Sequence, residues 1–241
     1  MPLLLNADLG EGVGADEAVM PHIHLANIAC GFHAGDQFSM QKTLQLAGQH
    51  GVVIGAHPSY RDLEGFGRRS MEHTPDEIVA LLHYQMAALD GMARSQGLAM
   101  DYVKPHGALY NDMMAKENVR RAVMEAVASF YRPLKLMIQA TTAAEQHQRE
   151  AELSGIKLWL EAFADRCYDD SGLLLPRSLP GAVHDRTRTL EQVAQLKEEG
   201  TVTTVGGHRL PLMADTLCVH GDNPESIGVI RQIRELLERD S

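Results

Sequence analysis

The chain has 241 residues, a formal net charge of -10 and an isoelectric point of about 5.6. This length suits one α/β domain with a sizeable core, and the acidic balance argues against nucleic acid or an anionic membrane as the main partner. Three cysteines without a CxxC pair favour free thiols in a reducing cytoplasm, with Cys30 and Cys218 as core residues. No apolar run approaches the ~20 residues of a membrane span, and the polar turn at Asn6 does not fit a secretory leader.

Short apolar runs bounded by Gly, Pro, Asn or Asp predict seven β-strands. They cover residues 3–5, 25–32, 52–56, 102–103, 134–139, 156–164 and 216–219. Helices are predicted at 36–50, 74–96, 116–129, 142–153, 189–199 and 224–238. The second helix has the clearest start signal, because Thr74 is followed by Pro75 and, three residues on, by Glu77. Asp36 or Ser39 is expected to cap the first helix.

Strands that alternate with helices predict a parallel sheet with right-handed crossovers. About seven such units, with polar carboxyl ends, favour a (β/α) TIM-like barrel whose site lies at the C-terminal face. An open doubly wound sheet is the rival fold. We expect residues 1–241 to form one domain, with an insertion at 171–212 over the barrel mouth. Inside the insertion, residues 202–210 predict a hairpin with a two-residue Gly-Gly turn.

Several predicted strands end in an ionisable side chain beside small residues. Because the carboxyl ends of parallel strands meet at one face of a barrel, we expect these groups to converge. One carboxylate and two imidazoles, from Asp8, His57 and His106, suit a divalent ion with open positions. His33 and His220 are further candidates. The alternative is that each histidine only hydrogen-bonds within a polar barrel mouth.

Lys104 follows two strand residues and precedes a proline, so its amine is delivered to the end of a strand. It could fix a carboxylate or phosphate, act as a base if desolvated, or form an ion pair with Glu161 or Asp165. Glu161 interrupts an apolar run and must face the site or a partner. Asp165 and Arg166 fit either a salt bridge or an acid–base residue beside an anion binder. Arg177 lies in a proline-rich loop and is a candidate ligand for a substrate carboxylate.

Other catalytic motifs are weak or missing in the sequence. The glycines at positions 10 and 12 superficially match a dinucleotide fingerprint, but the preceding strand is interrupted and no clear helix follows. The Gly-rich loop could still cradle a phosphate. There is no GxxxxGK[ST] phosphate loop and no GxSxG nucleophile motif, which argues against an intrinsic ATP engine and against a serine hydrolase.

Seven ordered motifs, spread over nearly the whole chain, resemble the LamB/YcsF family. They are NADLGE at 6–11, NIACGFHAGD at 27–36, GAHPSY at 55–60, FGRR at 66–69, VKPHGALYN at 103–111, EAFADR at 161–166 and CVHGD at 218–222. The resemblance implies a (β/α) barrel related to the glycoside hydrolase/deacetylase superfamily. In that superfamily an Asp and two His at strand ends often hold a metal, and the matching residues here are Asp8, His57 and His106. Mg, Mn or Zn would be the metal.

The same resemblance implies a 5-oxoprolinase that works together with subunits B and C. The expected reaction is hydrolysis of 5-oxo-L-proline (pyroglutamate) to L-glutamate, coupled to hydrolysis of ATP to ADP and phosphate. ATP would activate the unstrained lactam by phosphorylating its oxygen, after which water attacks with the help of a carboxylate or His base. The missing phosphate loop fits a chain that shares this task with partners.

These expectations assign roles to particular residues. The hypothesised catalytic residues are Asp8, Glu11, Lys104, His106 and Asp165. The hypothesised substrate-binding residues are His33, Asp36, Arg177 and His220. Two other functions stay open: a metal-dependent deacetylase or amidohydrolase that acts alone on an N-acyl substrate, and a non-catalytic subunit that binds the lactam for its partners. The sequence also leaves a homo-oligomer open.

Overall fold

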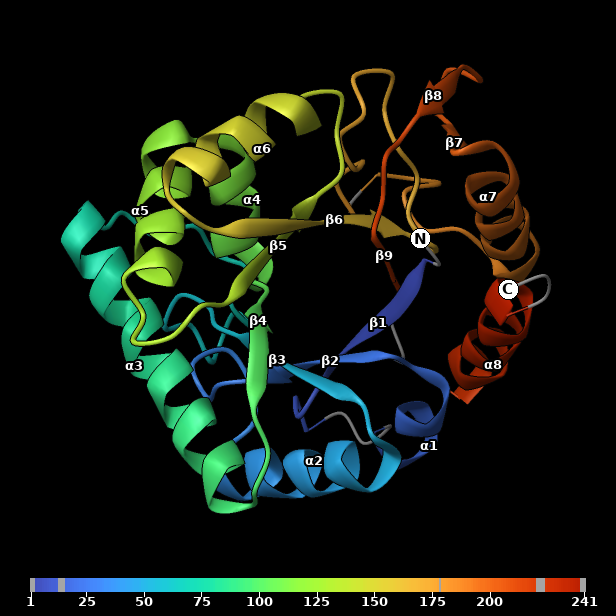
Figure 1. Ribbon diagram of the computed structural model, residues 1–241. Coiled ribbons are helices and arrows are strands. Elements are labelled where there is room, and N and C mark those ends of the chain that lie inside the picture. Colours follow the sequence, from blue (N-terminus) through green and yellow to red (C-terminus); the bar gives the residue numbers. More distant parts are fainter. Residues whose placement is uncertain (1–2, 13–15, 178, 220–223, 239–241) are drawn as a thin grey trace.

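The computed structural model describes residues 3–12, 16–177, 179–219 and 224–238. Seven parallel strands form a closed barrel in the order β1-β2-β3-β4-β5-β6-β9, and β9 closes the ring between β6 and β1 (Figure 1). Their bounds are Leu4–Leu9 (β1), Leu25–Ala29 (β2), Val53–His57 (β3), Met100–Val103 (β4), Lys135–Gln139 (β5), Lys157–Phe163 (β6) and Thr216–Cys218 (β9). The predicted barrel is therefore confirmed, and the open doubly wound sheet is wrong.

Helices surround the barrel on its outer side (Figure 1). They are α1 (Asp16–Val19), the 3-10 turn η1 (Met20–His22), α2 (Gln37–His50), α3 (Pro75–Ser95), α4 (Gly107–Ala115), α5 (Glu117–Ala128), α6 (Ala144–Leu153), α7 (Arg186–Glu199) and α8 (Pro224–Glu238). The α3 start is the predicted capping box, in which Thr74 and Glu77 satisfy each other's backbone N–H groups. The described helices include none with the length and apolar character that a membrane span needs.

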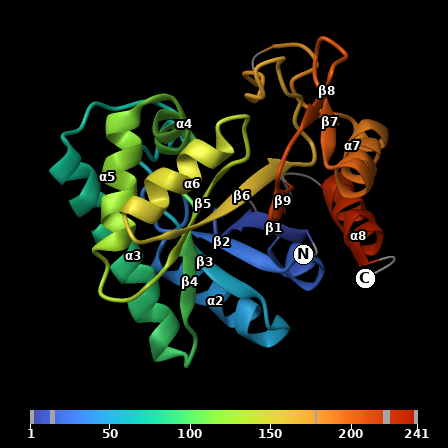
Figure 2. The same cartoon turned by 45° about the horizontal axis from the view of Figure 1, so that its top comes forward.

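The region between β6 and β9 contains α7 and a small hairpin, β7 (Thr201–Thr203) and β8 (Arg209–Pro211). Figure 2 shows the hairpin at one end of the molecule, with α7 packed beside α8. The predicted hairpin is present, but its turn is longer than two residues, because residues 204–208 separate the paired strands. The short α1 and the helix α4 were not predicted. The start of α4 was missed because its first residue is glycine, which has a low helix propensity.

The barrel interior is layered from apolar to polar along the strands. At the amino ends, Leu25, Tyr102 and Met137 form a small core of their own, separate from the main core between strands and helices. A side chain on Gly55 would collide with the Tyr102 ring, so glycine is required where that ring crosses the barrel. The Tyr102 hydroxyl donates a hydrogen bond to the Asn27 side chain at 2.7 Å, which begins the polar layer. The amino end of the barrel is therefore apolar, and the groups that could carry out chemistry lie at the opposite, carboxyl end.

Candidate functional site

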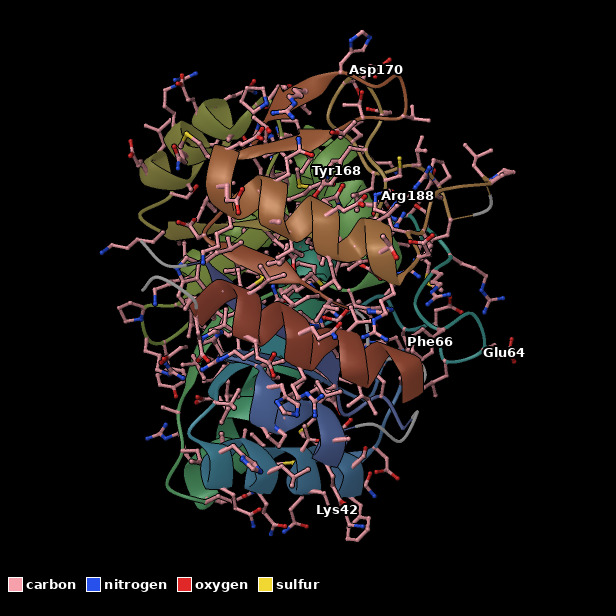
Figure 3. All side chains as sticks on the ribbon, turned by 90° about the vertical axis from the view of Figure 1, so that its right-hand side faces the viewer. Lys42, Glu64, Phe66, Tyr168, Asp170 and Arg188 are labelled. Atoms are coloured by element: carbon pink, nitrogen blue, oxygen red, sulfur yellow. The ribbon has the colours of Figure 1, made fainter. Side chains whose placement is uncertain are left out.

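The carboxyl ends of the strands open into a cavity of about 840 Å³. Its walls come from β1, β3, the segment after β4, α4 and the segment after β6, so distant parts of the chain meet there. Figure 3 shows the loop that bears Glu64 and Phe66 on the same side of the molecule as Arg188, at the start of α7. A second cavity, of about 530 Å³, lies beside Arg132 and Lys135 and contains none of the predicted site residues.

Lys104 is the centre of a buried ionic network on the floor of this cavity. Its Nζ lies 2.7 Å from Glu161 Oε1 and 3.0 Å from Asp8 Oδ1. Asn27 donates to the same Asp8 oxygen at 2.8 Å, and the Tyr110 hydroxyl donates to Glu161 Oε2 at 2.9 Å. The ion pair predicted between Lys104 and Glu161 is therefore present, with Asp8 as a second carboxylate partner.

The charge of Lys104 is fixed by these neighbours. Burial alone would lower the pKa of Lys104, but the negative charges of Asp8 and Glu161 outweigh it and raise that pKa well above its usual value. A lysine held as a cation does not act as a base at neutral pH. Of the roles considered for Lys104, the structure favours electrostatic stabilisation over proton abstraction.

Three histidines and two carboxylates gather beside this network. One ligand atom each from Glu11, His33, His57 and His106 lies within 4.8 Å of all the others. The His33 and His106 rings stack with their centroids 3.7 Å apart, and His33 Nε2 lies 3.0 Å from Glu11 Oε1. Asp8 Oδ2 lies 3.3 Å from His57 Nε2. This polar cluster of nitrogen and oxygen donors could hold a divalent metal ion.

Two of the imidazoles point lone pairs at one another. His57 Nδ1 lies 2.7 Å from the Lys104 carbonyl oxygen, and His106 Nε2 lies 2.9 Å from the Phe66 carbonyl oxygen. Because a carbonyl oxygen can only accept, both of these nitrogens carry the ring proton. The remaining nitrogens, His57 Nε2 and His106 Nδ1, face each other at 2.9 Å. When both rings are neutral, neither nitrogen can donate, so a proton or a metal cation is required between them.

The protonation of this cluster is set by its burial. Burial, reinforced by the positive charge that His57 can carry, lowers the pKa of both His33 and His106 to about 3. Both rings are therefore neutral at physiological pH. Neutral imidazole is the form that binds metal, and ligating histidines usually donate their other N–H to a carbonyl or carboxylate.

The loop between β3 and α3 brings the Phe66 carbonyl to His106. It is folded around the buried Asp62 carboxylate, which accepts hydrogen bonds from the Gly65 N–H at 3.0 Å and the Arg69 Nε at 2.8 Å. Phe66 itself has a φ of 53°, a left-handed conformation that is uncommon outside glycine. The carbonyl that fixes the His106 tautomer thus depends on a strained residue held by its loop.

A close contact between two glycines joins this loop to α4. The Ala108 N–H donates to the Gly67 carbonyl at 2.8 Å, and a Cβ on Gly107 would collide with that same carbonyl. A Cβ on Gly67 would lie 2.7 Å from His33 Cβ and 2.8 Å from His106 Cδ2. Both positions have positive φ, so glycine is required there for conformation and for space.

Most of the predicted site residues meet in the cavity or in the adjoining cluster. Those that do are Asp8, Glu11, His33, His57, Lys104, His106 and Arg177. Asp36 instead caps α2 at an exposed position, where its carboxylate accepts from the N–H groups of Phe38 and Ser39. Asp165 follows β6 but is not part of the cavity wall. His220 lies outside the described residues.

Some residues that shape the site were missed from the sequence. Asn27 and Gln139 each put a buried polar side chain in an apolar strand, which is the same signal that singled out Glu161. Tyr110 was missed because α4 was not predicted. The Phe66 carbonyl has no sequence signal, since any residue carries one and only the fold gives it a partner.

The comparisons with known proteins agree with the geometry. The sequence matches the LamB/YcsF family over residues 3–241. It is 52% identical to the 5-oxoprolinase A subunit of Pseudomonas fluorescens, covering 99% of this chain and 98% of that protein. It is 53% identical to the second 5-oxoprolinase A subunit of Pseudomonas putida, covering 98% and 94%. The crystal structure of the lactam utilization protein from Thermus thermophilus superposes with a TM-score of 0.90 at 40% identity, covering 99% and 97%.

Proposed function

Because the chain belongs to the LamB/YcsF family, we propose that it is the A subunit of an ATP-dependent 5-oxoprolinase. The names of relatives about half identical over nearly their whole length support this proposal. The structural observation that best supports the proposal is the cavity at the carboxyl ends of the strands. There, a lysine bound to carboxylates lies beside a cluster of histidines. We propose 5-oxo-L-proline as the substrate and subunits B and C as partners. ATP binding would then fall largely to those partners.

The proposed reaction has a balance of atoms that explains the need for ATP. Transfer of the γ-phosphoryl group to the lactam oxygen releases ADP and makes the ring carbon electrophilic. Water adds to that carbon, the ring C–N bond breaks as its nitrogen takes a proton, and an acyl phosphate remains. A second water releases phosphate and L-glutamate. The steps need a base for water and positive charge near the developing oxyanion.

The residues on the cavity floor suit those two needs. The Asp8 carboxylate is held by Lys104 and Asn27 through one oxygen, and its other oxygen faces His57. We propose Asp8 or Glu11 as the base that activates water. The Lys104 cation stabilises negative charge at the floor of the cavity, and His106 orients the reacting groups.

The converging lone pairs of His57 and His106 support a divalent metal ion at the same place. We propose that these two residues hold it with His33 and Glu11 or Asp8, and that Mn²⁺ or Zn²⁺ suits a set dominated by imidazole better than Mg²⁺. When bound, such an ion would supply Lewis-acid polarisation and lower the pKa of a coordinated water.

The direct test is glutamate release from 5-oxoproline by the three purified subunits, with and without ATP. We expect release only in the full mixture with ATP. If the full mixture releases none, the proposed function fails. Replacement of His106 by alanine should lower the rate with saturating lactam; an unchanged rate would instead support a non-catalytic, lactam-binding subunit.

The histidine–carboxylate cluster also favours one alternative, a metal-dependent amidohydrolase that needs neither ATP nor partners. The discriminating experiment gives the isolated chain Mn²⁺ or Zn²⁺ and N-acyl substrates without ATP. Turnover under those conditions would favour the alternative over the proposed role within a three-subunit enzyme.

We further propose a single domain over residues 1–241, with 171–212 as an insertion, and a cytoplasmic location. The three buried free cysteines are compatible with a reducing compartment. Limited proteolysis that cut the native chain into two separately folded halves would contradict the single domain.

A further inference from the structure

Arg166, just after β6, is a buried cation that the proposed chemistry has not used. Its side chain lines the cavity and is only 8% exposed. The guanidinium donates to two backbone carbonyls, from Nε to Ala182 at 3.3 Å and from Nη2 to Leu175 at 2.5 Å. Among the described residues, no carboxylate forms an ion pair with Arg166. Three of its five N–H groups remain for a ligand, because only two are used by these bonds.

The backbone that carries Arg166 is held rigidly. The Gln192 side-chain amide, from α7, donates to the carbonyl oxygens of Phe163 at 2.8 Å, Ala164 at 3.2 Å and Arg166 at 2.9 Å. Arg166 also forms a β-bridge with Val183 in the segment opposite. The guanidinium is therefore held in two ways, by the fixed backbone of its own residue and by its hydrogen bonds to two backbone carbonyls. A group held in this way loses little further conformational entropy when it binds an anion.

Two arginines contribute positive charge to this wall, and the neighbouring Asp165 carboxylate offsets part of that charge. Arg177 lines the same cavity, and burial together with the repulsion from Arg177 lowers the pKa of Arg166. Backbone carbonyls offset part of the desolvation of Arg166, but they carry no net charge. Two like charges at the wall of a cavity are stabilised by an anion that enters it.

We propose that Arg166 is the main contact of an anion subsite on this wall, with Arg177 beside it. The free side of the guanidinium suits a two-oxygen anion, which arginine binds through paired N–H donors. The identity of the anion rests on the proposed function: it is the carboxylate of 5-oxoproline, the only charged group of that substrate. The subsite then orients the lactam within the cavity that also holds Lys104 and the histidines. A phosphoryl group has the same oxyanion chemistry, so the experiment must separate the two.

The test compares wild-type and Arg166→Lys chains in the assembled three-subunit enzyme. Lysine keeps the charge but loses the paired donors. We expect the KM for 5-oxoproline to rise roughly 10- to 100-fold, as for a lost hydrogen-bonded charge contact, while the KM for ATP stays within about 3-fold. The matched control is Arg121→Lys on α5, whose side chain is 74% exposed and outside the cavity wall. It should change neither constant.

Each other outcome counts against the proposal. A rise in the KM for ATP with an unchanged KM for 5-oxoproline would assign the subsite to a phosphoryl group. No change in either constant would overturn the subsite itself. If Arg166→Lys does not fold, the wild-type enzyme still decides, because equal kcat/KM for 5-oxoproline and its neutral carboxamide would mean that no cation reads the carboxylate. Wild-type enzyme without any glutamate release would instead be a failure of the proposed function.

Discussion

At the scale of single residues, the site combines groups that would be unstable alone. Glu161 is fully buried and Lys104 nearly so, and each is tolerated because the other is within 2.7 Å. Asp8 adds a second negative charge to the same amine. Buried ion pairs add little to stability against apolar substitutes, but the loss of one partner leaves an uncompensated charge. The main role of the network is therefore to hold charged groups at fixed positions for chemistry.

Replacement of Lys104 by methionine should destabilise the fold by about 3–5 kcal/mol, because Asp8 and Glu161 would stay buried without their cation. Urea unfolding followed by circular dichroism measures this. The matched control is Arg121→Met, which removes an ion pair with Glu117 between two exposed side chains and should cost under about 1 kcal/mol. Equal losses in the two variants would mean that the carboxylates of the network do not depend on Lys104 for their burial.

At the scale of elements, the loop between β3 and α3 aligns the histidine cluster. Its glycine at position 67 lets the loop backbone pass against the His33 and His106 rings, and its Phe66 carbonyl fixes the ring proton of His106. The loop acts on the histidines through the position of its backbone and through the Phe66 ring, which lies edge-on to the His33 and His106 rings. Substitutions at Gly67, which lies against the rings, should therefore affect metal binding and activity more than stability.

Gly67→Ala should lower glutamate release in the assembled enzyme at least tenfold, since the new Cβ would displace both rings. Gly97→Ala is the control, because Gly97 also has a positive φ but has nothing within 4 Å of an added Cβ. Both variants carry the same backbone strain, roughly 1 kcal/mol. If activity falls equally in both, strain rather than ring displacement is the cause.

The Asp62 carboxylate should make the loop sensitive to acid. Hydrogen bonds from Arg69 lower the pKa of Asp62 to about 2, below its ordinary value of 3.8. A pKa that is depressed in the folded state adds stability above the ordinary value, and that stability is lost as the pH falls from about 4 toward 2. Asp62→Asn should be less stable than wild type at pH 7, with the difference vanishing near pH 2. Urea unfolding across this range tests it, with the exposed Asp101→Asn as control; a constant difference at all pH values would contradict it.

At the scale of the whole molecule, barrel closure explains why the site exists. Asp8, His57 and His106 are separated by up to 98 positions in the chain, yet each lies near or just after the carboxyl end of a parallel strand of one ring. The strands also point an apolar layer toward the other end of the barrel, which leaves the polar groups at a single mouth. A ligand that bridges several strand ends should therefore stabilise the whole fold.

Added Mn²⁺ or Zn²⁺ should raise the melting temperature of the wild-type chain. At 100 times Kd, binding adds about 2.7 kcal/mol, which corresponds to about 5–10 °C for a chain of this size. His57→Ala should abolish the rise, whereas His50→Ala, at the exposed end of α2, should retain it. Excess chelator should reverse the effect. A wild-type chain that melts at the same temperature with every divalent ion would remove the metal from the proposed site.

The sequence alone was sufficient to predict the barrel and the meeting of the polar strand ends. Strand and helix periodicity is local information, and parallel strands can close only with their carboxyl ends at one face. Capping residues such as Thr74 and Asp36 could also be predicted from the sequence, since a cap depends on neighbours three residues away. Asp36, however, was expected in the substrate site as well, and its carboxylate serves the cap.

Only the tertiary structure decided which polar groups contact one another. It joined Lys104 to two carboxylates, placed Glu11 beside the candidate metal-binding histidines His33, His57 and His106, and gave the Phe66 carbonyl its partner. Such pairings depend on distances of a few ångströms between residues far apart in the chain. Residue type and spacing do not contain those distances, because packing of helices, loops and barrel together sets them.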